Sequence, residues 1–164
     1  MMNKKTLFIT QAAMIAAIYV VLTICVNALG LASGVIQVRL SEALCILPIF
    51  TPAAIPGLFV GCLLSNISAG CVIYDVIFGS LATLIGACGT YLLRKTRFVF
   101  TLPPVLANSI IVPLILRYAY GVEDAIWFLM VTVGIGELIS VCVVGMILKA
   151  ALYKQRNYIF RQGN

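Results

Sequence analysis

Residues 41–68 read SEALCILPIFTPAAIPGLFVGCLLSNIS, and this stretch decides the fold. It is apolar almost throughout, yet Pro48, Pro52, Pro56 and Gly57 interrupt its middle, as expected for a turn or a kink. As a single helix, its 28 residues would extend about 42 Å, more than one membrane crossing requires. As two helices, each would be shorter than a bilayer.

Similar apolar segments continue on both sides of this stretch. The 164-residue chain is 63% hydrophobic, whereas soluble domains are about half apolar. Runs of roughly 20 apolar residues, the length that crosses a bilayer as a helix, recur between Leu7 and Lys149. Period-two alternation is absent, which argues against a barrel. The sequence therefore predicts an all-α, polytopic membrane protein with one domain over residues 1–164.

Basic residues decide between one crossing and two for residues 41–68. If this stretch crosses twice, nine of the eleven lysines and arginines fall on one side, without any acidic residue. A single crossing would put the 94–97 cluster and the C-terminal tail on opposite faces, against the positive-inside tendency. Both termini would therefore lie in the cytoplasm. We predict six spans, near residues 7–29, 41–51, 55–68, 74–93, 98–117 and 125–149. The second and third form a short hairpin that need not cross the membrane completely.

Other classes of protein are disfavoured. The first apolar run is longer than the roughly 7–15 residues of a signal-peptide core. The six cysteines lie scattered in apolar segments without CxxC spacing, so we interpret them as small buried hydrophobes rather than metal ligands. There is no GxxxxGK[ST] phosphate loop and no histidine. We therefore predict no catalytic residue and no metal site, and any ATPase must belong to another chain. The net charge of +6 does not indicate a nucleic-acid partner, because the basic residues lie at the ends of spans, where they set orientation.

Polar residues from different spans gather, under this topology, in the half of the bundle away from the termini. Ionisable side chains inside spans are costly and usually face a cavity or a partner. Glu137 is the strongest candidate, because it lies deep in its span and follows two glycines that leave room beside the helix. The full set of candidate binding residues is Arg39, Glu42, Asn66, Asp75, Asn108, Glu137, Tyr74 and Trp127.

Each candidate also has an ordinary structural interpretation. Arg39 and Glu42 fit an i,i+3 surface pair at a helix start, and Asp75 fits the positive end of a helix dipole. The two asparagines fit interhelical hydrogen bonding. Tyr74 and Trp127 are typical of an interfacial aromatic belt, with stacking against a planar ligand as the alternative.

Small residues form a second feature, in the first span. The stretch TQAAMIAAIYVVLT (residues 10–23) contains two alanine pairs with four-residue spacing, Ala12 with Ala16 and Ala13 with Ala17. Each pair shares a helix face, where small side chains let another helix come close. Such pairs are frequent by chance in apolar segments. Packing within the chain's own bundle is the ordinary interpretation, and docking of a partner helix is the alternative.

Four stretches together resemble the QueT family, the substrate-binding (S) components of energy-coupling factor (ECF) transporters. They are AAMIAAIYVVLT, QVRLSEALCILP, GLFVGCLLSNI and DVIFGSLATLIGACGTYL, and the likeness runs from about residue 10 to about residue 150. The most specific parts are RLSEAL with its following proline and the segments that contain Asn66 and Asp75. The alanine pairs are shared with other S components.

This resemblance implies a six-helix membrane protein that captures a micronutrient on the outer side of the membrane. Its partners would be the transmembrane coupling protein EcfT and two cytoplasmic ATPases, which use the ATP, so no cofactor is expected in this chain. QueT-like members are assigned to queuosine precursors, 7-deazaguanines such as the 7-cyano and 7-aminomethyl compounds, and queuine. The alanine motif would dock on the coupling protein through Ala12, Ala13, Ala16 and Ala17.

A 7-deazaguanine offers adjacent N–H donors beside a carbonyl acceptor. A carboxylate accepts from two neighbouring donors at once, which suits Glu137 or Glu42. Asn66 or Asn108 both donates and accepts, which suits the carbonyl and the pyrrole N–H. Asp75 would complement an aminomethyl cation.

Arg39 completes this hypothesis, because it would orient Glu42 and keep it charged at the mouth of the site. Three alternatives remain open at the level of sequence. One is an S component for another vitamin. A second is a self-sufficient carrier in which Asp75 and Glu137 relay protons. The third is a membrane scaffold that binds no small molecule.

Overall fold

The computed structural model describes residues 3–30, 39–155 and 159–160, and within them every regular element is a helix. This confirms the predicted all-α class. Short helices of other geometry join the α-helices: η1 (Leu40–Ile49) and η3 (Val99–Thr101) are 3-10 helices, and η2 (Asp75–Gly79) and η4 (Leu138–Val144) are π-helices. The α-helices are α1 (Lys4–Ala28), α2 (Ala54–Ser68), α3 (Ser80–Leu92), α4 (Leu102–Tyr118), α5 (Ile126–Glu137) and α6 (Gly145–Tyr153).

Four continuous helical stretches in the described residues have the length and composition to cross a membrane. They agree to within a few residues with the predicted spans 7–29, 74–93, 98–117 and 125–149, so the chain is a multi-pass membrane protein. The second and third each join an α-helix to a neighbouring π or 3-10 segment, and the fourth joins α5 and α6 through η4. The four stretches are Lys4–Ala28, Asp75–Leu92, Val99–Tyr118 and Ile126–Tyr153.

The predicted spans 41–51 and 55–68 correspond to two shorter helices, so six full crossings are not confirmed. The 10 residues of η1 and the 15 residues of α2 extend about 20 and 22 Å. The hydrocarbon core of a bilayer is about 30 Å thick. Pro48 lies inside η1 and has no N–H to donate, which limits regular α-helical bonding there.

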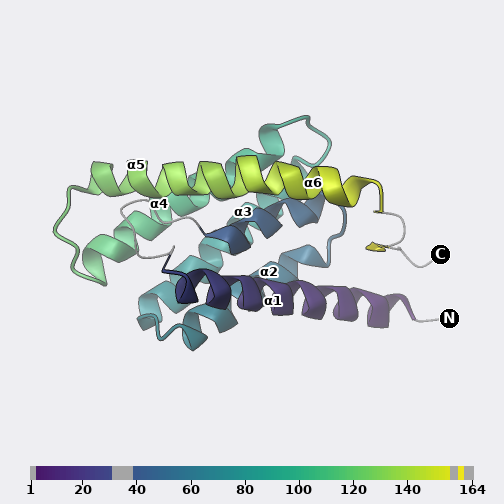
Figure 1. The fold of residues 1–164 in the computed structure, drawn as a ribbon, viewed down its shortest axis with the longest axis horizontal. Helices are drawn as coiled ribbons and strands as arrows, with labels where there is room; N and C mark the ends of the chain where they lie inside the picture. Colours follow the sequence, from purple (N-terminus) through teal and green to yellow (C-terminus); the bar gives the residue numbers. More distant parts are fainter. Residues whose placement is uncertain (1–2, 31–38, 156–158, 161–164) are drawn as a thin grey trace.

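The bundle has two distinct ends (Figure 1). We call the end where α1 begins and α6 ends the terminal end, and the opposite one the distal end. Lys4 and Arg94 line a cleft at the terminal end. Asn27, Cys71 and Val122 line a pocket at the distal end. Connections between helices therefore alternate between the two ends, and η1 and α2 run between them as a short hairpin.

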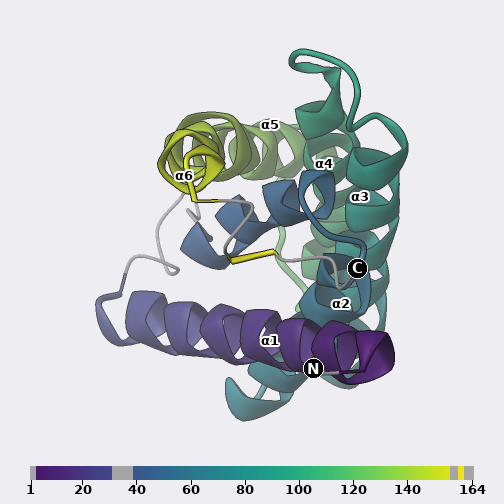
Figure 2. The same cartoon turned by 90° about the vertical axis from the view of Figure 1, so that its right-hand side faces the viewer.

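The η1 helix occupies the centre of this bundle. Eight consecutive residues, 41–48, are buried. Figure 2 shows this blue helix between α1 on one side and α5–α6 on the other. Leu44 packs in one apolar cluster with Ile15 of α1, and Ile46 packs in another with Phe100 and Val141. A helix that is apolar on all sides is expected to be buried in this way.

Small residues allow α1 and α2 to pack closely. A Cβ added at Gly57 would lie 2.7 Å from the carbonyl oxygen of Ala12. One added at Gly61 would lie 2.8 Å from the Cβ of Tyr19 and 3.1 Å from the Cα of Ala16. Ala12 and Ala16 of α1 therefore pack against Gly57 and Gly61 of α2. This agrees with the ordinary interpretation of that alanine pair, packing within the chain's own bundle.

We expect Gly61→Ala to lower the free energy of unfolding by about 1–3 kcal/mol, because the new methyl group must displace α1. Thermal unfolding in detergent, followed by circular dichroism, measures the change. Ala17→Val serves as the control, since it adds methyl groups to an exposed position of α1 and should change stability by less than about 0.5 kcal/mol. Equal melting temperatures for the wild type and Gly61→Ala would contradict this packing.

Candidate functional site

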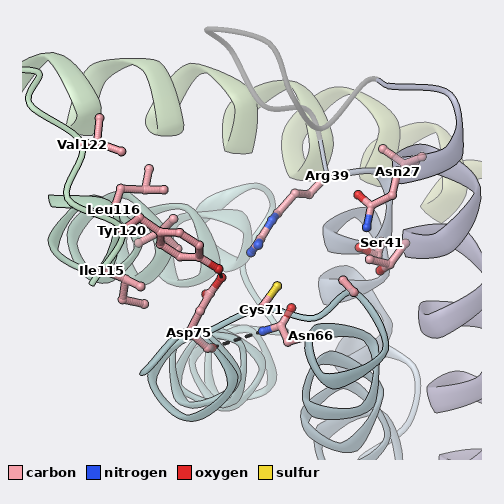
Figure 3. A pocket seen from close by; sticks show the side chains of 14 residues that line it. Asn27, Arg39, Ser41, Asn66, Cys71, Asp75, Ile115, Leu116, Tyr120 and Val122 are labelled. Carbon is pink, nitrogen blue, oxygen red and sulfur yellow. Dashed lines mark hydrogen bonds between the residues drawn. The ribbon is translucent and has the colours of Figure 1, made fainter. Parts of the chain in front are cut away.

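A pocket of about 300 Å³ lies at the distal end of the bundle. Its walls are formed by the end of α1, the start of η1 with Arg39 before it, the end of α2 and the loop that follows, Asp75 of η2, and the end of α4 with the α4–α5 loop (Figure 3). Three of the predicted site residues line it together although they come from three separate segments. These are Arg39, Asn66 and Asp75.

The polar side of this pocket is built around Asp75. The Tyr120 hydroxyl donates to Oδ2 of Asp75 at 3.0 Å, and Nδ2 of Asn66 donates to the Asp75 backbone carbonyl at 3.2 Å. Arg39 extends into the pocket from the other side and interacts electrostatically with Asp75 (Figure 3). A Cβ at Gly79 would lie 2.8 Å from Oδ1 of Asp75. The glycine therefore lets this carboxylate lie against its own helix.

Tyr120 is suited to its role as a donor. Partial burial raises the pKa of its hydroxyl, and the neighbouring Cys71 and Asp75 raise it further. The hydroxyl therefore stays protonated at neutral pH and keeps its hydrogen bond to the carboxylate.

Glu42 lies beneath the pocket rather than at its mouth, and none of its surface is exposed. Its carboxylate accepts hydrogen bonds from the Tyr19 hydroxyl, from Sγ of Cys45 at 3.0 Å and from Oγ1 of Thr83 at 3.4 Å. These donors come from α1, η1 and α3, so the hydrogen bonds of one carboxylate link η1 to α1 and to α3. Since Glu42 is buried, an exposed surface pair with Arg39 does not describe it.

Glu137 and Asn108 form a second buried polar group, with only 3% and 1% of their surfaces exposed. Glu137 is close enough to Glu42 and Arg39 to interact with them electrostatically. Asn108 lies one helical turn from Val112, which lines the pocket. The deepest predicted site residues thus lie under the pocket without lining it.

Several of these buried atoms lack hydrogen-bond partners within the described part of the chain. They are Oδ1 of Asp75, Oε2 of Glu137 and both polar side-chain atoms of Asn108; Asn108 and the Glu137 carboxylate nevertheless lie close enough to interact with each other. Leaving such an atom unpaired in a protein interior costs about 1–3 kcal/mol, so native proteins rarely do so without a reason. Polar atoms of a ligand that reached this layer would be stabilised by it.

The two predicted aromatic residues are not brought to this pocket. Tyr74 is 59% exposed and Trp127 is 67% exposed. Tyr74 lies in an apolar groove on the outer surface beside α3 and α4, and the Trp127 ring meets Phe128 edge-on. Their positions fit the interfacial-belt interpretation.

No cluster of three or more potential metal-ligating side chains occurs among the residues that the structure describes. All six cysteines are free thiols, and Cys45 and Cys62 are buried as expected for small hydrophobes. The same interpretation is wrong for Cys25, which is exposed on the outer surface of α1. That surface faces lipid in a membrane, so an apolar side chain is still tolerated there.

Three hydrogen-bonding residues of this region are absent from the set of binding residues predicted from the sequence: Tyr19, Thr83 and Tyr120. Tyr19 carries a usable signal, because it continues the face of Ala12 and Ala16 and an inward-facing tyrosine needs a hydrogen-bond partner. Tyr120 carries none, since its place beside Asp75 depends on how the α4–α5 loop folds back.

The chain is similar in sequence to a known transporter family and to a curated member of it. The family model described as QueT transporter matches residues 9–154. The queuosine precursor transporter QueT of Lactococcus lactis subsp. cremoris (strain MG1363) is 36% identical over 85 residues, which are 52% of this chain and 50% of that protein. The chain thus spans about half the length of the curated relative it matches. No solved structure matches it.

We expect Tyr19→Phe to lower the free energy of unfolding by about 1–3 kcal/mol, because it removes a donor to a buried carboxylate. Denaturation in detergent measures the change. Tyr118→Phe is the matched control, since Tyr118 is 80% exposed. If both variants unfold like the wild type, Glu42 does not depend on Tyr19.

Proposed function

Because the chain belongs to the QueT transporter family, we propose that it is the substrate-binding component of an ATP-driven importer of queuosine precursors. A protein of this transporter family is not an enzyme. The curated relative is named for the same class of substrate. The observation that carries the proposal is the layer of unpaired, buried polar atoms in and beneath the distal pocket.

The orientation of the chain follows from its charges. In the described residues, basic side chains gather at the terminal end, where α1 begins, α3 meets α4 and α6 ends; they are Lys4, Lys5, Arg94, Lys95, Arg97, Lys149 and Lys154. Basic residues favour the cytoplasmic side of a membrane. The terminal end therefore faces the cytoplasm of a bacterial cell, and the distal pocket opens outward, where a substrate is captured.

The polar groups of the site match a 7-deazaguanine. In this proposal the base extends past the floor of the pocket to the buried layer beneath it. There the Glu137 carboxylate accepts from the adjacent N–H donors of the pyrimidine edge, and Arg39 or Asn108 donates to the neighbouring carbonyl. A volume near 300 Å³ lies at the lower end of the range for ligand pockets, about 300–1,000 Å³, and suits a small bicyclic base.

The charges around the site favour a cationic substituent on this base. Asp75 and Glu42 both interact with a single described guanidinium, that of Arg39. Carboxylates therefore outnumber cations. An aminomethyl group at position 7 would add a positive charge and would bind beside Oδ1 of Asp75, whereas a nitrile would add none.

We assign the docking of a partner protein to the exposed alanine pair of α1. Ala12 and Ala16 pack against α2, whereas Ala13 and Ala17 are exposed. We assign docking on the coupling protein EcfT to Ala13 and Ala17, with two partner ATPases supplying the energy. The chain itself has no phosphate-binding loop.

Calorimetric titration of the purified protein tests the substrate. We expect 7-aminomethyl-7-deazaguanine to bind, and Glu137→Gln to weaken it by about 1.5–3 kcal/mol, the value of a hydrogen bond to a charged group. Glu123→Gln is the matched control, since Glu123 is an exposed carboxylate in the α4–α5 loop.

Other results, of this titration or of an uptake assay in liposomes, would change the assignment. Unchanged affinity in Glu137→Gln would remove Glu137 from the site. Binding of thiamine or riboflavin in place of any deazaguanine would assign the chain to another vitamin. Uptake into liposomes by this chain alone, driven by a pH gradient, would favour a self-sufficient carrier.

The docking assignment is tested separately. We expect Ala13→Leu and Ala17→Leu to retain substrate binding but to reduce ATP-dependent uptake by the reconstituted complex at least about tenfold, because bulky side chains keep helices apart. Ala150→Leu, an exposed alanine of α6, is the matched control. Normal uptake by both α1 variants would place the coupling protein on another face.

A further inference from the structure

A second cleft, of about 530 Å³, lies at the terminal end of the bundle and shares no residue with the distal pocket. One face of α1, the turn between η1 and α2, and the end of α3 form its walls. We propose that this cleft binds an anionic phospholipid, with the phosphodiester between Lys4 and Arg94. The proposal concerns a lipid of the surrounding bilayer and is independent of the transported substrate.

The two cations of the cleft come from separate elements. Lys4 lies in the first turn of α1, and Arg94 follows the end of α3. The Arg94 guanidinium lies 3.9 Å from the centre of the Tyr91 ring and donates Nη1–H to the Tyr91 carbonyl at 2.7 Å. This bond uses one of its five N–H donors. The guanidinium is thus held at the cleft with donors suited to a phosphate.

Gln11 adds a neutral donor to this cationic site. The buried Thr51 hydroxyl donates to Oε1 of Gln11 at 2.9 Å, which fixes the orientation of the amide. The amide nitrogen is then available to a phosphate or ester oxygen. No acidic side chain is among the described residues that line the cleft. Its polar groups therefore favour an anion.

The remaining walls are apolar, which distinguishes this cleft from a site for a free ion. Leu7 and Phe8 lie beside Lys4, and Ile49 and Phe50 lie opposite. An amphipathic ligand is complementary to both the cationic and the apolar walls of the cleft. Its phosphate contacts the cations, and its glycerol and acyl carbons contact the apolar side chains. The cleft also lies at the ends of membrane-spanning helices, where headgroups are found, and basic pockets at this level bind anionic headgroups.

Native mass spectrometry of the full chain in detergent, titrated with phosphatidylglycerol or phosphatidylcholine of identical acyl chains, tests the proposal. We expect phosphatidylglycerol to bind about tenfold more tightly, since two basic groups face its phosphate. The double variant Lys4→Gln, Arg94→Gln should lose most of this preference. The matched double variant Lys5→Gln, Lys154→Gln removes the same charge from exposed positions at the same end that do not line the cleft, and should keep it.

Three outcomes would overturn the proposal. Equal affinity for the two lipids would show that the cleft does not select an anion. Equal losses in the two double variants would assign the effect to the overall charge of this end. Displacement of the lipid by inorganic phosphate at the same concentration would indicate a free-anion site. Circular dichroism melting of all variants establishes that they are folded.

Discussion

The carboxylate of Glu42 at the centre of the bundle requires hydrogen-bond donors, and the arrangement of the neighbouring helices depends on these hydrogen bonds. Burying a carboxylate in an apolar interior without hydrogen-bond donors is costly. Glu42 is fully buried, and Tyr19, Cys45 and Thr83 donate to it from three elements. These bonds hold η1 between α1 and α3, where its eight buried residues also complete both apolar clusters.

The position of η1 determines what lies at the two ends of the bundle. Arg39 immediately precedes this helix and lines the distal pocket, whereas Ile49 ends it and lines the terminal cleft. Glu42 also bonds to Tyr19, which continues the α1 face that packs on α2. A shift of η1 would therefore change the distal pocket, the terminal cleft and the position of α1 together.

Agreement between sequence and structure varies with the kind of feature. The four long spans agree to within a few residues, because each is a local run of apolar side chains. Residues 41–68 form a shorter hairpin that hydropathy alone does not place, and it lies in the centre of the bundle. Among the predicted site residues, Arg39, Asn66 and Asp75 share one pocket, whereas Tyr74 and Trp127 lie on the outer surface.

The sequence by itself determined the class of protein, the long spans and the gathering of basic residues at one end. These properties follow from hydropathy and charge, which each segment carries independently of its neighbours. Only the tertiary structure decided that Glu42 is buried and accepts hydrogen bonds from three elements, while Arg39, three residues earlier, lines a pocket. Only it separated Ala12 and Ala16, which pack inside, from Ala13 and Ala17, which are exposed. The physical reason is that a side chain's environment depends on which helix packs against it, and that packing joins residues far apart in the chain.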